Sequence, residues 1–163
     1  MILSPDYWKG RLKVVQEAGL PQHHAIFKIA EGAWKFIEEK HRSILAYRIG
    51  PDQSVLDCGC GWGRLLTLMP ANWKGDYLGI DISPDFIELA EKEHSDFLFK
   101  VGDLRDAEAL AMGQQFDWAV MISIRPMVKR HTGIWPECEA AIRKVAKKLL
   151  YLEYDPLDEG SVE

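Results

Sequence analysis

Apolar residues recur every three or four positions through the first fifty residues, a pattern typical of amphipathic helices. A first helix is predicted to begin at Ser4-Pro5-Asp6, where a capping hydroxyl, a proline and an acid stand together, and to end near Gly19. A second, longer helical stretch is predicted from Ile26 to Tyr47 and ends at Gly50-Pro51. Residues 1–50 are therefore expected to form a helical N-terminal extension.

After Pro51 short apolar runs alternate with helical segments, and this alternation predicts an α/β fold with a parallel sheet and helices on both faces. The run 116–123 is almost continuously apolar, as strands buried on both faces are. We expect strands at 55–56, 77–80, 97–101, 116–123 and 149–154, and helices at 64–69, 84–90, 107–112 and 136–148.

The strongest chemical signal is the loop Asp57-Cys58-Gly59-Cys60-Gly61-Trp62-Gly63, which follows the first predicted strand. Glycines at alternate positions let the backbone turn sharply and approach a ligand closely. The loop opens a helix, whose free N–H groups face the ligand. The carboxylate of Asp57 would repel the pyrophosphate of a dinucleotide but suits an ammonium group, so the loop favours a ligand that contains an amino acid.

Two further acids follow the next predicted strands. Asp81 ends the second strand, 24 residues after Asp57, where a βαβ unit places a carboxylate that holds ribose hydroxyls. Asp103 follows the third strand, where its carboxylate can accept a hydrogen bond from a nucleobase amine while Leu104 and Ile82 sandwich the ring. Each acid alone is typical of a solvated loop, but the three in this order favour a nucleoside site.

In their order along the chain, the segments D-x-G-x-G-x-G, G-I-D-I-S, G-D-L and F-D-W-A-V-M-I-S resemble the class I, Rossmann-like methyltransferases that use S-adenosyl-L-methionine. The resemblance covers residues 50–155 and implies one domain over 1–163, with its cofactor-binding core at 51–155 and a three-layer sheet of strand order 3-2-1-4-5. It also implies a set of cofactor-binding residues: Asp57, Cys58, Gly59, Cys60, Gly61, Trp62, Gly63, Asp81, Ile82, Asp103, Leu104 and Ser123.

In this resemblance the glycine loop surrounds the methionine moiety, Asp81 holds the ribose, Asp103 and Leu104 meet the adenine, and Ser123 borders the methyl group. For Trp62, packing against the first helix is as good an interpretation as ligand contact. The aromatic residues Tyr7 and Trp8 and the nearby Arg11 can form a lid over the cofactor, although packing of an amphipathic helix is the favoured interpretation. His23-His24 and His41 are assigned to polar helix faces without a catalytic role.

The end of the chain departs from that family, whose sheet usually has seven strands with the last two forming an antiparallel edge. Here the chain stops soon after the fifth predicted strand, so we expect no antiparallel strand after it and an acidic tail at 156–163. The fifth strand would then be an apolar edge, and exposed edges invite pairing. We expect the N-terminal helices or a second copy of the chain, in a homodimer, to cover it.

Positive charge gathers in the segment predicted as a loop after the fourth strand, at Arg125, Lys129, Arg130 and His131. Such a run is often only a solvated surface, but ligands bind at the carboxyl ends of parallel strands. Arg125, Arg130 and His131 are therefore candidates for holding an anionic, small-molecule methyl acceptor. His131 is the candidate general base. No N-P-P-Y-like segment follows the fourth strand, which disfavours methylation of an amino group on a DNA base.

The overall composition narrows these alternatives. A net charge of -5 argues against broad nucleic-acid binding. The sequence contains no run of eighteen apolar residues, so we expect no membrane-spanning helix. The three cysteines are too few and too oddly placed for a set of disulfides, and the five histidines offer no pair at the spacing of metal ligands. We therefore expect a cytoplasmic protein. Two rival functions remain open, namely a cofactor-binding module that assists a catalytic partner and an NAD-dependent oxidoreductase. The acid before the glycines counts against the second.

Overall fold

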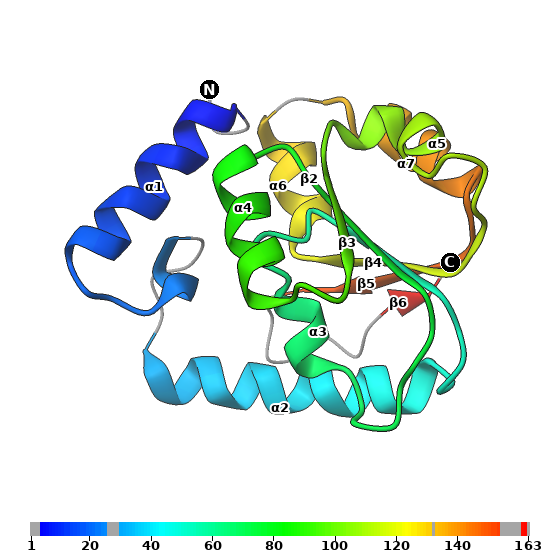
Figure 1. The fold of residues 1–163 in the computed structure, drawn as a ribbon, viewed down its shortest axis with the longest axis horizontal. Helices are drawn as coiled ribbons and strands as arrows, with labels where there is room; N and C mark the ends of the chain where they lie inside the picture. Colours follow the sequence, from blue (N-terminus) through cyan, green and yellow to red (C-terminus); the bar gives the residue numbers. More distant parts are fainter. Residues whose placement is uncertain (1–3, 26–29, 132, 154–160, 163) are drawn as a thin grey trace.

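A six-stranded sheet forms the centre of the protein (Figure 1). The structure is a computed structural model, which describes residues 4–25, 30–131, 133–153 and 161–162. The sheet order is β3-β2-β1-β4-β5-β6, and the first five strands run parallel, so the predicted order 3-2-1-4-5 is confirmed. The strands are β1 (Val55–Cys58), β2 (Tyr77–Asp81), β3 (Leu98–Val101), β4 (Phe116–Ile122), β5 (Ala146–Leu152) and β6 (Ser161–Val162).

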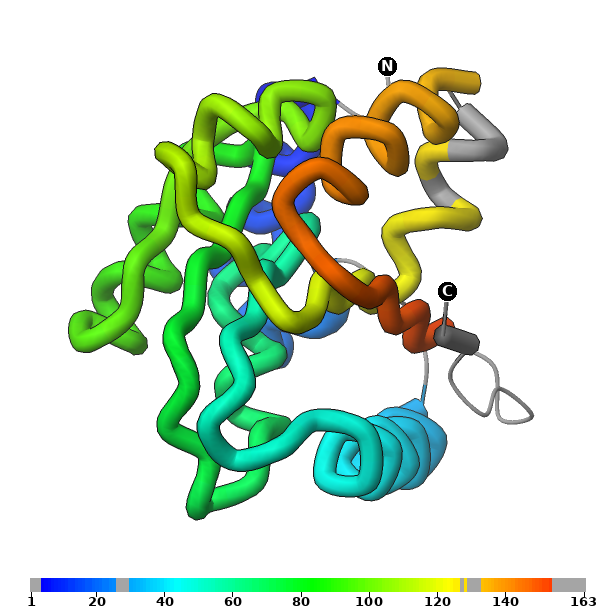
Figure 2. Tube along the Cα trace, turned by 90° about the vertical axis from the view of Figure 1, so that its right-hand side faces the viewer, coloured from blue at the N-terminus to red at the C-terminus, as the bar shows by residue number. Residues whose placement is uncertain are grey.

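Helices cover both faces of this sheet, as Figures 1 and 2 show. The N-terminal extension supplies α1 and α2, and its Ser4 accepts a hydrogen bond from the backbone N–H of Tyr7, which is the predicted cap. Ser83 caps α4 in the same way, through the N–H of Phe86. The α-helices are α1 (Pro5–Glu17), α2 (Glu31–Arg48), α3 (Arg64–Leu68), α4 (Pro84–Glu93), α5 (Ala107–Leu110), α6 (Ile124–His131) and α7 (Trp135–Arg143), and the 3-10 turns are η1 (Gln22–Ala25) and η2 (Leu104–Asp106).

The hydrophobic core has two layers, one on each face of the sheet. Alternate residues of β5 show the division, because successive side chains of a strand point to opposite faces. Leu149 and Tyr151 join the cluster that includes α7, whereas Leu150 and Leu152 join the cluster that includes α3 and α4. All four are fully buried. No described helix combines the length and the apolar composition that crossing a bilayer requires.

The N-terminal extension packs onto this core through aromatic side chains. Trp8 of α1 lies 6.2 Å from the ring of Phe86 on α4, and Trp62 of the glycine loop lies 6.0 Å from the same ring. Arg11 donates hydrogen bonds to the backbone oxygens of Ala25 and His24, at 2.8 and 3.2 Å. The packing interpretation of the N-terminal aromatic residues is therefore confirmed for Trp8, and Trp62 packs in the same cluster.

The predicted boundary between the last helix and the fifth strand was wrong. The helix was expected to continue through Lys148, but α7 ends at Arg143 and β5 begins at Ala146. Pairing with the neighbouring strand decides this, because β5 runs beside β4 from Phe116↔Ala146 to Ile122↔Leu152. Lys147 adds an ion pair of 2.8 Å to Asp117 on β4. Such cross-strand contacts override the local preference of the segment.

The segment after β4 was predicted to be a loop and is instead helix α6, Ile124–His131. Pro126 is compatible with this helix because it stands in the first turn, where a proline costs no helical hydrogen bond. Ser123 precedes the helix with a φ of 58°, in the left-handed region, and so turns the chain sharply out of the strand. The candidate acceptor-binding residues therefore lie on a helix.

The expectation that no antiparallel strand follows the fifth was also wrong. Ser161–Val162 lie in the segment predicted as an acidic tail, and they pair antiparallel with Leu150 and Tyr151 of β5. Backbone N–H and C=O groups at an edge favour a partner, and here the chain's own end supplies it. This short strand provides part of the cover that we expected from the N-terminal helices or a second subunit. The homodimer stays a prediction.

Candidate functional site

The glycine loop between β1 and α3 has the backbone geometry that only glycine adopts readily. Gly59, Gly61 and Gly63 have φ values of 75°, 55° and 81°, all in the left-handed region. A Cβ atom at Gly59 would also lie 2.4 Å from Cδ1 of Ile124, whereas one at Gly61 would meet no atom within 4 Å. The loop thus curls tightly against α6 on one side and leaves open space at Gly61 on the other.

Asp81, at the end of β2, holds this loop in place. Its carboxylate accepts one hydrogen bond from the backbone N–H of Gly61 and another from that of Ser83, both at 2.9 Å. Burial raises the pKa of Asp81, and the backbone N–H groups oppose that rise. The two acids at the ends of β1 and β2 are therefore brought to the same edge of the sheet, as the sequence predicts.

Asp57 carries a buried carboxylate, and only 2% of the residue is exposed. It accepts a hydrogen bond of 2.8 Å from the hydroxyl of Tyr77. Burial raises the pKa of Asp57 to about 7, although the Tyr77 hydrogen bond acts in the opposite direction. A positively charged group placed beside this carboxylate would offset the cost of its lost hydration.

A small pocket opens beside the loop and combines three parts of the chain. The glycine loop and the first turn of α3 form most of it, the end of β4 adds Ile122, and the N-terminal extension adds Trp34 from α2. The pocket is lined by Trp34, Asp57, Gly59, Cys60, Gly61, Trp62, Arg64, Leu65 and Ile122. Five of the predicted cofactor-binding residues thus face one cavity, and Trp34, Arg64, Leu65 and Ile122 were not predicted.

The cysteines of the loop pack as small buried side chains. Cys58 and Cys60 are buried, as is Cys138 on α7, and all three are free thiols. Burial raises the pKa of Cys58 and Cys60 well above the usual range, so neither carries a thiolate at neutral pH. Cys60 lines the pocket, whereas Cys58 belongs to the core on the side of α7.

The other predicted cofactor residues lie at neighbouring strand ends. Asp103 caps η2 and forms a two-pronged ion pair with Arg105, at 3.1 Å to Nε and 2.8 Å to Nη2, which lowers the pKa of Asp103. Leu104 begins η2, and Ile82 packs at the margin of the Trp8 and Trp62 cluster. The Ser123 hydroxyl oxygen is buried and has no hydrogen-bond partner within the described part of the chain.

Of the three predicted acceptor-binding side chains, the structure describes one. The guanidinium of Arg125 lies 3.9 Å above the ring of Tyr151, and its Nε is 3.5 Å from a carboxylate oxygen of Glu153. The backbone of Arg130 and His131 belongs to α6, but their side chains lie outside the described residues. Arg125 therefore stands at the carboxyl ends of β4 and β5 with an acid beside it.

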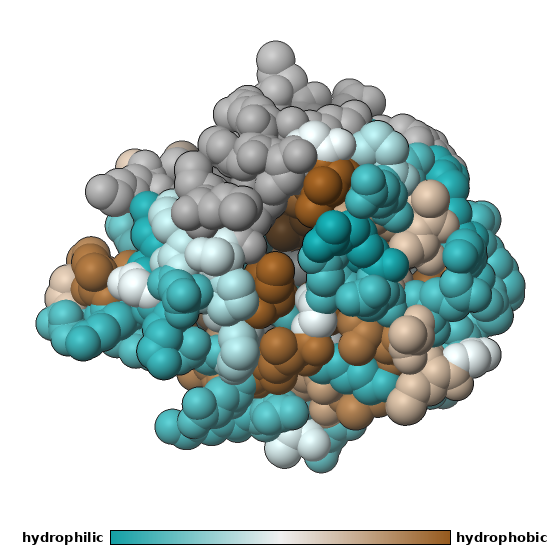
Figure 3. Space-filling model, turned by 90° about the horizontal axis from the view of Figure 1, so that it is seen from above, coloured by the Kyte–Doolittle hydropathy of each residue, from teal (hydrophilic) through white to brown (hydrophobic). Residues whose placement is uncertain are grey.

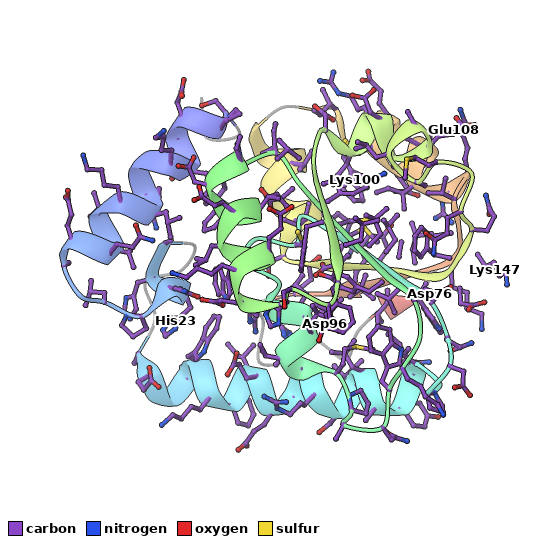
Figure 4. The ribbon with its side chains drawn as sticks, in the orientation of Figure 1. His23, Asp76, Asp96, Lys100, Glu108 and Lys147 are labelled. Atoms are coloured by element: carbon purple, nitrogen blue, oxygen red, sulfur yellow. The ribbon has the colours of Figure 1, made fainter. Side chains whose placement is uncertain are left out.

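Two histidines assigned to polar faces are buried. His41 is 1% exposed, and its Nε2 donates to the backbone oxygen of Glu153 at 3.1 Å, because a carbonyl can only accept. His23 (Figure 4) stacks on Trp34 with ring centroids 4.1 Å apart, and burial lowers the pKa of His23. The spacing Trp34, Ile37, His41 and Leu45 already marks His41 as part of the apolar face of α2.

Comparison with known proteins agrees with this geometry. The methyltransferase domain family matches residues 55–149, which include β1, the glycine loop and Asp81. The chain belongs to this family. A cyclopropane-fatty-acyl-phospholipid synthase of Escherichia coli strain K12 is 32% identical to this methyltransferase domain over 79 residues, 47% of the chain and 19% of that protein. The chain thus spans about a fifth of the length of this curated relative.

Two solved structures share the fold of the methyltransferase domain. A TehB-like SAM-dependent methyltransferase from Corynebacterium glutamicum aligns with a TM-score of 0.57 at 19% identity, over 90% of this chain and 71% of its own. The magnesium protoporphyrin IX methyltransferase from Synechocystis PCC 6803, solved with bound SAH, aligns with a TM-score of 0.61 at 18% identity, over 90% and 68%. The predicted Rossmann-like fold and methyltransferase family are therefore confirmed.

Proposed function

We propose that this chain binds S-adenosyl-L-methionine at the glycine loop and transfers its methyl group to a small-molecule acceptor. The observation that carries the proposal is the hydrogen bond between the Asp81 carboxylate and Gly61 N–H, within a domain of the methyltransferase family. This bond joins the acid suited to ribose hydroxyls to the loop suited to the methionine moiety. The open space at Gly61 and the buried Asp57 carboxylate fit the same ligand.

Several residues would each contact a different part of the cofactor. Asp57 would face the ammonium group, Asp81 the ribose hydroxyls and Asp103 the adenine amine. Asp103 can take this role while paired with Arg105, because each carboxylate oxygen has more than one acceptor site. Leu104 and Ile82 would bracket the ring, Ser123 would border the reacting methyl group, and the rest of the predicted loop, Cys58 to Gly63, would surround the methionine end.

The bound cofactor supplies a methyl group activated by its positively charged sulfur. What the protein adds is alignment of the acceptor and exclusion of water, and alignment alone can contribute about 7–11 kcal/mol. Trp34 and Trp62 wall the pocket with apolar rings. The buried hydroxyl of Ser123 stands at the end of β4, beside pocket residue Ile122, where it can orient an incoming nucleophile.

For the acceptor we propose a small molecule with a carboxylate or phosphate. The support is the charge of α6, which carries Arg125, Lys129, Arg130 and His131 and no acid. Arg125 already lies beside Glu153, so an anionic acceptor would share this guanidinium with the acid. The face of the molecule seen from above carries apolar and hydrophilic side chains side by side (Figure 3). His131 is the proposed general base.

A ligand comparison tests the cofactor assignment. S-adenosylmethionine and S-adenosylhomocysteine should raise the thermal unfolding midpoint of the purified chain, and NAD should leave it unchanged. Formation of S-adenosylhomocysteine, followed by mass spectrometry with a panel of small carboxylates and phosphates, then tests turnover. Stabilisation by NAD alone would reject the proposal in favour of an oxidoreductase. Binding of the cofactor with no turnover on any acceptor would favour a module that assists a catalytic partner.

A further inference from the structure

Arg64 places a buried cation in the pocket of the glycine loop. It is the first residue of α3, directly after Gly63, and it is 7% exposed. It lines the pocket together with Asp57, and these two are the only charged residues in the described lining. The positive charge of Arg64 acts on Asp57 by lowering its pKa, against the larger effect of burial. The pocket therefore presents one anion and one cation to whatever occupies it.

Three side chains of α2 hold the Arg64 guanidinium in this position. The guanidinium carbon lies 4.3 Å from the ring centroid of Trp34, in a cation–π contact. Nε is 3.4 Å from a carboxylate oxygen of Glu38, and Nη2 is 3.5 Å from Nδ1 of His41. His41 uses its other ring nitrogen to donate to Glu153, so Nδ1 is available to accept from Arg64. The arginine is thus oriented by packing as well as by charge.

The chemistry of an α-amino acid matches this pair of charges. Its ammonium and carboxylate groups stand on one carbon, and each loses hydration when it enters a pocket lined by tryptophan rings. Asp57 can compensate the ammonium only. A guanidinium is the usual partner for a carboxylate in such a place, because its planar fork donates two parallel hydrogen bonds. Lysine would offer a single point charge.

We infer that Arg64 binds the α-carboxylate of the cofactor's amino acid end, opposite Asp57, which takes the α-ammonium. This inference rests on the proposed cofactor. Arg64 is then a specificity-determining residue, since it distinguishes ligands that carry the carboxylate from otherwise identical ligands that lack it. Trp34, Glu38 and His41 are positioning residues that act through Arg64.

The test compares S-adenosylmethionine with decarboxylated S-adenosylmethionine, which keeps the ammonium and lacks only the carboxylate. Binding of each to the wild-type chain and to Arg64→Met is measured by titration calorimetry. Wild type should prefer the complete cofactor by about 10- to 100-fold, the range expected for a charge-assisted pair. Arg64→Met should lose this preference by binding the complete cofactor more weakly and the decarboxylated one with unchanged affinity. Arg64→Lys should retain part of it.

Arg42→Ala is the matched control, because Arg42 is an exposed arginine of α2 that donates to the backbone oxygen of Thr67. It should leave both affinities unchanged. Equal weakening of both ligands in Arg64→Met would show a purely structural role and overturn the inference, as would unchanged binding of the complete cofactor. If wild type binds neither form, the proposed function fails, and the inference fails with it.

Discussion

The hydroxyl of Tyr77 donates a 2.8 Å hydrogen bond to the carboxylate of Asp57, and both side chains are buried. Because burial raises the pKa of Asp57 to about 7, the ligand-free protein holds this proton more tightly than the unfolded chain, where the pKa is near 3.8. The contribution of Asp57 to stability is fully present below pH 3.8 and is lost as the pH rises to about 7. Urea unfolding at pH 5 and pH 8 should show this loss.

Asp57→Asn should remove the Asp57 part of this pH dependence and raise stability at pH 8 relative to wild type. Tyr77→Phe should extend the loss to higher pH, because the hydrogen bond from Tyr77 opposes the rise in the pKa of Asp57. A wild-type profile that stays parallel to that of Asp57→Asn between pH 4 and pH 8 would contradict the assignment. Buried carboxylates with raised pKa values cluster at functional sites, so the profile also bears on function.

Asp81→Ala should weaken the binding of S-adenosylhomocysteine about 100-fold or more, because the loop loses a charge-assisted hydrogen bond and the ligand loses an acceptor. Calorimetric titration measures this directly. Asp85→Ala is the control, since Asp85 stands four residues later on α4 and pairs only loosely with Lys9, at 3.7 Å. Unchanged binding in Asp81→Ala would contradict the assignment of the ribose hydroxyls to Asp81.

Gly59→Ala should destabilise the fold by about 1–3 kcal/mol, because φ is 75° and a Cβ would lie 2.4 Å from Ile124. Gly10→Ala offers a comparison inside α1, where a Cβ meets nothing within 4 Å. That change should be neutral or stabilise by up to about 1 kcal/mol. Urea unfolding of both variants gives the difference. Equal stabilities would mean that the loop accommodates a side chain at Gly59.

Removing residues 161–163 should expose the backbone edge of β5 beside Leu150 and Tyr151. We expect the shortened chain to associate as its concentration rises, which light scattering coupled to size-exclusion chromatography would detect. Removing Glu163 alone is the matched control and should leave the mass unchanged relative to the full chain. If the shortened chain keeps the same mass as the full chain at all concentrations, the antiparallel pair does not protect this edge.

The parts of the fold that local chemistry decides were predicted correctly. Ser4 and Ser83 cap helices because their hydroxyls accept hydrogen bonds from backbone N–H groups three residues later. Short apolar runs in the sequence predict the parallel strands. Two of the errors in the fold lie where pairing between distant strands decides the structure. Ala146 joins a strand because Phe116 stands beside it, and Ser161 and Val162 do so because β5 needs an edge partner. No local pattern contains that information.

In the candidate site, too, some residues were predicted from the sequence and others were missed. The sequence pattern identifies glycines and acids at the ends of strands. It therefore predicted that Asp57, Gly61 and Asp81 belong to one site, and the structure places them close together. Trp34 and Arg64 were missed, because their meeting depends on how α2 crosses α3. Asp103 was placed correctly beside its strand, but its pairing with Arg105 two residues away was overlooked.

One wall of the pocket comes from outside the segment that the family shares. Trp34 stands twenty-one positions before residue 55, where the family match begins, yet it lines the same cavity as Asp57. A chimera that grafts residues 51–155 onto the helical cap of another methyltransferase would therefore inherit the glycine loop without its cover. Engineers who wish to transplant this ligand preference must carry α2 along with the loop, as a single exchangeable unit.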